Sequence, residues 1–512
     1  MRHTRWFGKI IKVKNKEPEE QNIAQQIGLY RVYQGKKYLL PLGELITSHV
    51  RKIMEEDLGD TLALMLPPRG GRLDWAVLLA GEIKSYTELP VWIRLKDGRG
   101  WFEEQTEKES EALNLTSRYL CVEENQIVEK ADKWRSTVEK LFSTLGFEKT
   151  KFSENGKDFE YFMEDEHGNS TRLCCYECGW LGSRNVHPVN LESEADESNT
   201  VDPELSISKI ETPGIKTIRD LADFFNTDPN TTIKSVFLES DEGVFIQALI
   251  RGDREVSRKK VEWKLGVQGV RAASAESVQR VGAPAGYAGP VMNDDFFPNK
   301  TIVDSSISES RNYIAGANKE GWHVRGVRPG RDFKIHLRGD ISQAKEGGRC
   351  SFCGGILQKK RGRVLASWRV WQNLFSLSGS DSKRKQIGAG IGTLNTGQIM
   401  EVLIRRGSGD KSMHWPGGIS PFNVYMISIR EEELAEKIYR DLESAGVTIF
   451  YDDRKVSPGI KFKDADLMGC PFRLTVSSRS IKNGGIEVYV VNNNDEEIIS
   501  VEEIVSWITT RV

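Results

Sequence analysis

Two Cys-x-x-Cys pairs are the residues of this sequence best suited to chemistry. Cys175 and Cys178 form the first pair, in CYEC, and Cys350 and Cys353 form the second, in CSFC. Zinc prefers four soft ligands in a tetrahedron, and each turn supplies two thiolates with backbone amides directed at the sulfurs. We therefore predict a structural zinc ribbon that joins the two ends of the intervening segment. The alternatives are four free thiols or, less favoured in a chain without a secretory signal, a disulfide.

The composition limits the class of protein. The chain has 512 residues, 38% of them hydrophobic, and its 72 basic residues balance 74 acidic ones. A chain of this length makes about three or four domains with cores of their own. A net charge near zero gives no overall basic field, so any nucleic-acid surface must be local. The charged start and the lack of an apolar run of about eighteen residues predict a cytoplasmic chain with no membrane partner.

Hydrophobic periodicity predicts the elements that position the first cysteine pair. Apolar residues at helical spacing predict helices over 42–57, 73–85 and 124–146. The segment 151–175 reads as strands joined by an Asn-Gly turn and a His-Gly-Asn turn. A polar run over 191–202 then predicts a linker.

An α/β pattern fills the segment between the cysteine pairs. A Thr-x-x-Asp start predicts a helix opened by Thr217. Alternating residues predict strands at 233–238 and 244–251, followed by helices at 257–265 and 275–281 and a strand in TIVDSSI. We place this inserted domain at residues 205–340.

The last part of the chain, residues 416–512, has a second α/β pattern. Strands and helices are predicted in the order β-α-β-α-β-β-α, with the long helix between NVYMISI and VTIFYDD. A Ser500-x-x-Glu503 capping box is predicted to open the final helix. The chain as a whole is thus a mixed α/β and α+β multidomain protein.

Three stretches resemble bacterial-type prolyl-tRNA synthetases, a family of class II aminoacyl-tRNA synthetases. The synthetase core is resembled by GLYRVYQGKKYLLPLG and EIKSYTELP. The inserted editing domain is resembled by ETPGIKTIRDLADFF, GAPAGYAGP and EGWHV. The anticodon-binding domain is resembled by WPGGISPF and DDRKVSPGIKF. The resemblance implies an antiparallel-sheet core made of residues 1–190, ending in the first cysteine pair, and 341–415, containing the second. It also implies a homodimer, and an editing domain that removes alanine from proline tRNA.

The ligase motifs of that family are not kept. Class II adenylation needs arginines on the ATP phosphates, since a guanidinium meets phosphate bidentately and keeps its charge. The family's motif 3 arginine falls on Asn395, and its glutamate and histidine after the zinc ribbon fall on Val364 and Ser367. The phrase that grips proline is replaced by Arg72–Trp75. Arg94, Arg99 or Arg118 could substitute, and the run IGAGIG is either a phosphate loop or, as we expect, a tight packing turn.

The editing resemblance assigns candidate site residues in the insert. It implies a catalytic group of Lys234, His323 and Asp304, in which the lysine holds a phosphate or the developing oxyanion. Small loop residues let backbone amides approach a substrate carbonyl. The implied substrate-binding residues are Gly282, Gly286, Gly289, Pro290, Arg251 and Asn318. The alternative leaves Lys234 on a solvated strand edge and His323 as a core contact.

Four cations of the C-terminal domain are candidates for tRNA binding. They lie in the loop and helix start of DDRKVSPGIKFK and are Arg454, Lys455, Lys461 and Lys463. Such side chains contact phosphates, which position RNA without reading its sequence. The alternative is a solvated protein surface.

These features lead to three hypotheses about function. The first is a synthetase-like protein that binds tRNA, specifically tRNA(Pro), cannot form prolyl-adenylate, and hydrolyses mischarged tRNA at the insert. The second is a working proline–tRNA ligase with a rearranged site, which would need ATP and magnesium. The third is a non-catalytic protein that regulates an authentic aminoacyl-tRNA synthetase or binds tRNA alone. Zinc is a candidate structural cofactor in each of them.

Overall fold

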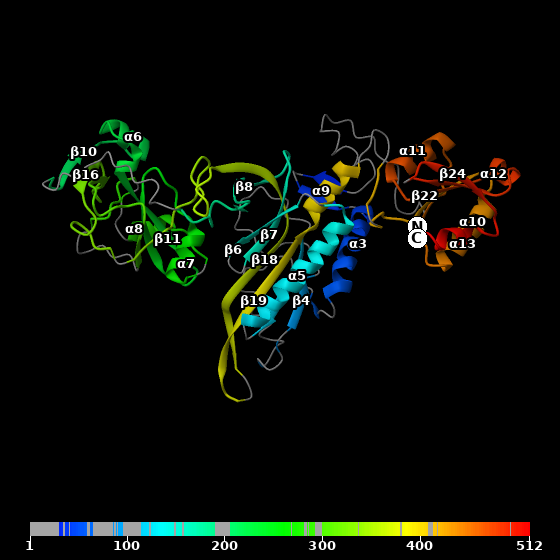
Figure 1. Cartoon of the computed structure of the whole chain (residues 1–512), viewed down its shortest axis with the longest axis horizontal. Helices are drawn as coiled ribbons and strands as arrows, with labels where there is room; N and C mark the ends of the chain where they lie inside the picture. The colour runs from blue at the N-terminus through cyan, green and yellow to red at the C-terminus, as the bar shows by residue number, and fades with distance from the viewer. Residues whose placement is uncertain are drawn as a thin grey trace. The chain divides into compact units, whose positions relative to one another are not determined.

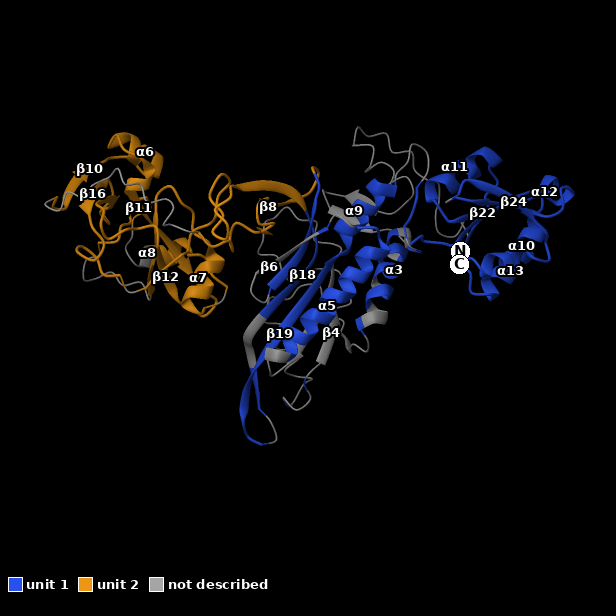
Figure 2. Cartoon of the chain, viewed as in Figure 1, with its two compact units in different colours: residues 1–165, 363–512 blue, residues 166–362 orange. Residues whose placement is uncertain are grey.

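A computed structural model gives the structure of the chain (Figure 1). It describes residues 30–33, 36–39, 41–58, 62–64, 85, 89, 91–95, 114–121, 124–147, 150–155, 158–189, 205–267, 269–280, 284, 286–291, 300–335, 337–378, 381–407, 413–416, 418–491 and 493–512. The chain divides into two compact units, residues 1–165 with 363–512 and residues 166–362 (Figure 2). The second unit holds both cysteine pairs together with the insert, whereas we had expected the pairs to belong to the synthetase-like core.

The first unit contains a largely antiparallel sheet with the order β3-β4-β5-β19-β18-β7-β6. Its antiparallel pairs include β4–β5, β5–β19 and β18–β19, whereas β3 and β4 are parallel. The strands are β3 (Leu62–Leu64), β4 (Val91–Leu95), β5 (Asn114–Cys121), β6 (Thr150–Asn155), β7 (Asp158–Glu164), β18 (Leu357–Ser378) and β19 (Arg384–Asn395). The sheet confirms the antiparallel core that the resemblance implied.

Helices that contribute to one apolar core accompany this sheet. They are α3 (Pro41–Leu58), which follows the hairpin β1 (Tyr30–Tyr33) and β2 (Lys36–Leu39), α5 (Glu124–Thr144) and α9 (Thr396–Gly407). The helix predicted over 124–146 is confirmed, because its apolar positions Ile127, Ala131, Trp134, Val138, Leu141 and Phe142 are buried in that core. The helix predicted over 42–57 is also confirmed. The one predicted over 73–85 lies outside the described residues, apart from Ser85.

The C-terminal α/β domain has a five-stranded sheet with the order β21-β20-β22-β23-β24. Its elements are β20 (Val424–Ile429), α10 (Glu432–Ser444), β21 (Ile449–Asp452), α11 (Pro458–Met468), β22 (Phe472–Ser477), α12 (Ser478–Lys482), β23 (Ile486–Val490), β24 (Asp495–Ile499) and α13 (Ile504–Thr509). The predicted capping box is wrong. A turn separates Ser500 from α13, and the Ser500 hydroxyl donates to the Glu503 carboxylate instead of accepting from its amide. The sequence pattern also missed α12 and β24.

The insert of the second unit is a mixed sheet with the order β10-β16-β15-β11-β12-β14-β17, to which β13 adds on β11. The strands are β10 (Ser208–Glu211), β11 (Thr232–Glu239), β12 (Phe245–Arg251), β13 (Arg271–Ala272), β14 (Lys300–Asp304), β15 (Tyr313–Gly316), β16 (Trp322–Val327) and β17 (Arg338–Gly339). Its helices are α6 (Ile218–Phe224), η3 (Pro229–Thr231), α7 (Arg258–Leu265) and α8 (Ala275–Arg280). The predicted start at Thr217 is confirmed, because its hydroxyl accepts from the Asp220 amide.

Alternation along the strands gives the insert two apolar layers. Ile246, Ala248 and Ile250 of β12 belong to the cluster that includes Val261 of α7, whereas Leu249 belongs to the cluster on the other face. The remaining strands of the unit, β8 (Ser170–Cys175) and β9 (Leu181–Gly182), pair with each other. Strand β8 also pairs with the start of β18, and this small sheet carries the cysteines. None of the described helices is long and apolar enough to span a membrane.

Candidate functional site

Lys234 and His323 lie in one row across the sheet of the insert. Strand β11 runs parallel to β15 with Ile233 opposite Ala315, which brings Lys234 level with Gly316. Strand β15 pairs with β16, and Gly316 lies opposite His323. Residues in register share a face of the sheet, so the two side chains flank a glycine at a separation of about 10 Å between their backbones. The sheet thus brings two of the three predicted catalytic residues together.

The loop 286–291 closes over this glycine. A Cβ atom at Gly316 would overlap the backbone oxygens of Tyr287 and Ala288, and one at Gly289 would overlap the Gly316 carbonyl. Asn318 fixes the loop, because its Oδ1 accepts from the Gly289 amide at 2.8 Å and its Nδ2 donates to the Val291 carbonyl at 2.8 Å. Glycine is therefore required at both close approaches.

Two backbone amides of this loop are candidate donors. Within the described part of the chain, the amides of Gly286 and Ala288 have no protein acceptor. Gly286 has a φ of 84°, which a glycine adopts without strain. The predicted site glycine Gly282 lies outside the described residues, and Pro290 is buried next to Gly289.

His323 is a buried and neutral residue. Its Nδ1 lies 2.6 Å from the Thr212 hydroxyl, and its ring centroid is 5.3 Å from that of Tyr287. Burial lowers the pKa of His323 below its ordinary value, and a backbone hydrogen bond with Gly286 only partly opposes this. The imidazole thus ties the segment beginning at Thr212 to the glycine loop.

Lys234 has a different environment. Its Nζ lies 2.8 Å from Glu255 Oε1, and the side chains are 19% and 73% exposed. An exposed carboxylate contributes little to holding a lysine, because solvent screens the pair. The ammonium is therefore free to exchange this partner for an anionic ligand.

The sheet separates Asp304 and Arg251 from His323. Asp304 lies on β14, four strand spacings or about 19 Å from the histidine strand. Its buried carboxylate accepts from the amides of Ser306 at 3.0 Å and Ile341 at 2.8 Å. Arg251 lies opposite Ile233, on the other face from Lys234, and its guanidinium binds Asp253. Asp304 and Arg251 thus make structural contacts, and the predicted grouping of Asp304 and Arg251 with His323 is not formed.

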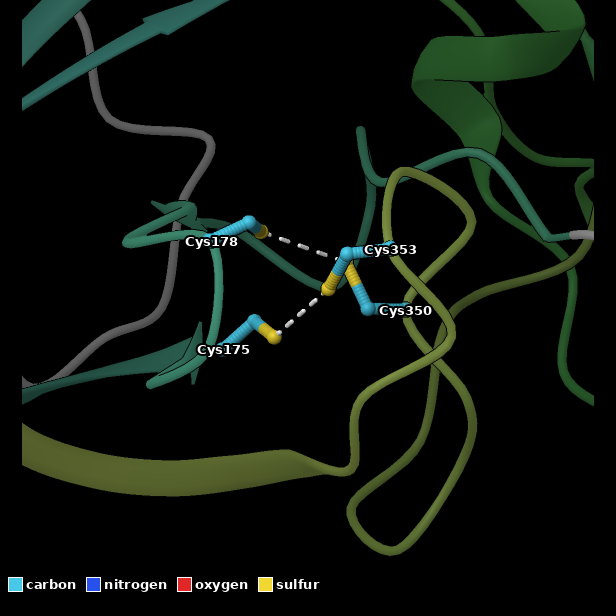
Figure 3. A group of neighbouring side chains, drawn as sticks. All are labelled: Cys175, Cys178, Cys350 and Cys353. Carbon is cyan, nitrogen blue, oxygen red and sulfur yellow. Dashed lines mark hydrogen bonds between the residues drawn. The ribbon is translucent and has the colours of Figure 1, made fainter.

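The four cysteines converge as the sequence predicted (Figure 3). Their sulfur atoms all lie within 4.8 Å of one another, with 3.4 Å between Cys175 and Cys353 and 3.7 Å between Cys178 and Cys350. A tetrahedron with zinc–sulfur bonds of about 2.3 Å has edges of about 3.8 Å, so the cluster fits one such ion. The Cys178 amide lowers the pKa of Cys175 to about 7, whereas burial raises the pKa of Cys350.

Contacts that the sequence did not predict attach the cysteine cluster to the insert. Ser257, the N-cap of α7, donates to the Asn185 carbonyl at 2.6 Å. The buried Lys260 ammonium binds Asp340 at 2.8 Å, and the same carboxylate accepts from the Val189 amide at 2.9 Å. Helical spacing placed Lys260 on α7 but gave no signal that it is buried, because its partner lies 80 residues away.

In the synthetase-like core, Asn395 occupies the end of β19 and caps α9. Its Oδ1 accepts from the Gln398 amide at 3.0 Å. The glycine run before it is part of β19, so the prediction of a tight turn is wrong. Gly390 and Gly392 leave room for Trp368 and Trp134, whose rings a Cβ atom would overlap. The glycines thus serve packing and form no phosphate loop.

The other ligase positions lie on β18 or outside the described part of the chain. Val364 and Ser367 lie on β18, one and four residues after Arg363, which sequence reasoning did not single out. The buried Arg363 guanidinium binds Asp165 and Glu401. Residues 72–75 and Arg99 lie outside the described residues, as do the side chains of Arg94 and Arg118.

Two of the four predicted tRNA-binding cations make internal contacts. Arg454 binds Asp452 and Asp464, both at 2.6 Å. Lys461 is buried, and its Nζ donates to the Ser428 and Asp452 carbonyls. Lys455 and Lys463 are exposed and remain suited to phosphate contacts.

Comparison with known proteins matches both α/β domains to families. Residues 212–333 match the aminoacyl-tRNA editing domain, and residues 423–511 match the anticodon binding domain. A computed superposition on the crystal structure of prolyl-tRNA synthetase from Cryptosporidium parvum with L-proline and AMP covers 96% of this chain and 78% of that one. The superposition has a TM-score of 0.44 at 11% identity.

Relatives extend the match over the synthetase-like core. The proline–tRNA ligase of Dehalococcoides mccartyi is 32% identical over 364 residues, which are 69% of this chain and 62% of the relative. The proline–tRNA ligase of Brachyspira hyodysenteriae is 29% identical over 467 residues, which cover 85% of this chain and 78% of the relative. The chain thus spans less than two thirds of the length of the Dehalococcoides protein. By this likeness and its two matched domains, the chain belongs to the proline–tRNA ligase family.

Proposed function

We propose that this protein binds tRNA and hydrolyses the ester bond of alanyl-tRNA(Pro) at the insert, without activating proline. The observation that carries the proposal is the row of Lys234, Gly316 and His323 beneath the glycine loop, within the segment that matches an editing domain. The anticodon-binding match and the exposed Lys455 and Lys463 support tRNA binding.

The residues suit ester hydrolysis. Water attacks the carbonyl carbon, the bond to the ribose oxygen breaks, and that oxygen takes a proton. The Gly286 and Ala288 amides would stabilise the negative charge on the carbonyl oxygen, and Lys234 would hold a phosphate or that oxygen. His323 is a positioning residue, because it links Thr212 to the loop while staying neutral. Alanine is the proposed amino acid because the resemblance of the insert to the family's editing domain implies it.

Hydrolysis of alanyl-tRNA(Pro) by Lys234→Ala tests this assignment. We expect a rate at least about tenfold below wild type, since a charge-assisted contact in the transition state is lost. Lys209→Ala, which removes an exposed lysine of β10 in the same domain, should keep the wild-type rate. Equal rates of hydrolysis by wild type and a Lys234→Ala, His323→Ala double variant would contradict the proposal that the insert catalyses this reaction.

We propose that proline is not activated because residues of the family's ligase motifs are replaced in this chain. Asn395 brings no charge to a triphosphate, and its side chain caps α9. The relatives are proline–tRNA ligases, which favours the alternative of a working ligase with ATP and magnesium. Proline-dependent ATP–pyrophosphate exchange separates the two, and we expect none.

We also propose that the four cysteines bind one structural zinc ion. Cys175, Cys178, Cys350 and Cys353 would hold it, and the ion would join two segments far apart in the chain. A homodimer is part of the proposal, on the likeness of the N-terminal segment to the family. Co-purification with an aminoacyl-tRNA synthetase or tRNA, without any turnover, would instead favour the regulatory hypothesis.

A further inference from the structure

Gln247 is a buried polar side chain in the sheet of the insert. It belongs to β12 and is 1% exposed. Residues two apart along a strand share a face, so Gln247 lies on the same face as Leu249. Leu249 and Ile233 belong to one apolar cluster, and Lys234, the next residue of β11, lies on the opposite face. Gln247 is therefore separated from the substrate side of the sheet by the sheet itself.

The amide of Gln247 joins three segments of the insert. Its Nε2 donates to the Gly289 carbonyl at 3.2 Å and to the Ser235 hydroxyl of β11 at 3.3 Å. Its Oε1 accepts from the Thr301 hydroxyl of β14 at 3.4 Å. A carbonyl can only accept, so the end of the amide that faces Gly289 must be the NH2 group. Both N–H donors of the side chain are thus used, and one of them holds the glycine loop.

Gly289 has both of its backbone polar groups bound by side chains. Its amide donates to Asn318 Oδ1 at 2.8 Å, and its carbonyl accepts from Gln247 Nε2. The preceding residue is Ala288, whose amide is a candidate donor to the developing oxyanion. Such a donor is effective when it is already in place, because the protein then does not reorganise during the reaction.

We propose that Gln247 is a positioning residue for ester hydrolysis, which holds the glycine loop from the face of the sheet opposite to Lys234. The inference rests on the proposed function, because it names a further residue of the same site. Gln247 acts through Gly289, and Asn318 holds the same loop residue by its amide. The two side chains together fix the height of the loop above the sheet.

Gln247→Met tests this role, because methionine is of similar length and has no hydrogen-bond donor. The kcat for alanyl-tRNA(Pro) should fall at least about tenfold, since a small displacement of the amide donors weakens their contact in the transition state. The KM should change by less than about twofold, because the groups that bind the tRNA are unchanged. A loss of folded protein alone would lower the apparent enzyme concentration without this split in a titration of active sites.

Hydrogen-exchange mass spectrometry measures the position of the loop directly. Residues 286–291 should exchange faster in Gln247→Met than in wild type, whereas residues 246–250 of β12 should exchange as in wild type. Gln247→Asn gives a second variant for the case in which methionine prevents folding. It keeps a buried amide that is one carbon too short for the Gly289 carbonyl, so the same loss of kcat is expected.

Ser235→Ala is the matched control. It removes the other acceptor of the same Nε2 and leaves the bond to Gly289 in place. We expect wild-type kcat and wild-type exchange of residues 286–291. Wild-type kcat in folded Gln247→Met would overturn the inference, as would an equal loss of kcat in Ser235→Ala.

Failure of the proposed function would look different. A wild-type protein that does not hydrolyse alanyl-tRNA(Pro) would remove the proposed activity, and faster exchange of the loop in Gln247→Met would still show that Gln247 positions the loop. Hydrolysis at equal rates by wild type and Gln247→Met would overturn the role of Gln247 and leave the proposed activity intact.

Discussion

Lys234 and His323 share a face of one sheet, but different forces hold them. The lysine is paired with an exposed glutamate, whereas the histidine is buried between Thr212 and Tyr287. A ligand can displace the first contact at little cost, whereas breaking the second would leave buried polar groups without partners. At this scale, Lys234 is suited to bind substrate and His323 to maintain the shape of the loop.

The close approach at Gly316 can be tested by one methyl group. Gly316→Ala should abolish hydrolysis and lower the free energy of unfolding by about 1–3 kcal/mol, because its Cβ atom would overlap the Tyr287 carbonyl. Urea denaturation and the deacylation rate measure the two effects. Gly459→Ala, at a helical position with open space around it, should leave both the hydrolysis rate and the free energy of unfolding unchanged. Full activity of Gly316→Ala would show that the loop does not close over this residue.

Burial of His323 predicts a pH-dependent stability. The folded-state pKa of this histidine is below the ordinary value of 6.5, so the unfolded chain binds more protons in that range. The free energy of unfolding should therefore fall as the pH drops below about 6.5. His323→Gln should reduce this dependence in urea titrations at a series of pH values. His167→Gln, which removes an exposed histidine of the same unit, should preserve it.

The arrangement of the strands and helices determines which of these residues lie close together. Periodicity was sufficient to predict α5, α7 and β12, because their apolar positions follow the geometry of the element itself. It could not show that Lys461 and Asp304 are buried, because their acceptors and donors come from other segments. Spacing also gave no reason to separate Arg251 from Lys234, since the face of a strand residue depends on register. The four cysteines were predictable because metal ligation restricts residue type and spacing together.

The cap of α9 gives a prediction at the scale of one helix. Asn395→Ala should lower the free energy of unfolding by about 1 kcal/mol, since the Gln398 amide loses its acceptor. Asn395→Asp should retain most of the stability, because aspartate also caps helices. Urea denaturation compares the three proteins. Identical stability of Asn395→Ala and wild type would contradict the capping role.

The cysteine cluster gives a second prediction at this scale. Cys350→Ser should lose bound zinc and increase hydrogen exchange in residues 172–182 and 348–358, because one ligand of four is removed. Metal analysis and hydrogen-exchange mass spectrometry measure both effects. Cys470→Ser, a change at a buried cysteine of the C-terminal domain, should keep one zinc per chain. An unchanged exchange pattern in metal-free protein would mean that the ribbon folds without the ion.

In the whole molecule, we expect tRNA binding and ester hydrolysis to take place on different parts of one chain. The C-terminal domain carries the exposed Lys455 and Lys463, whereas Lys234 and His323 belong to the insert. The synthetase-like core keeps its antiparallel sheet and apolar core, although its motif 3 residue caps a helix.

The most direct test of the central claim compares the hydrolysis of alanyl-tRNA(Pro) with that of prolyl-tRNA(Pro) by the same protein without ATP. We expect release of alanine at a rate well above the spontaneous one, and no release of proline, because residues 212–333 match an editing domain that we propose to act on alanyl-tRNA(Pro). Spontaneous rates for both substrates, or equal release of both amino acids, would contradict it.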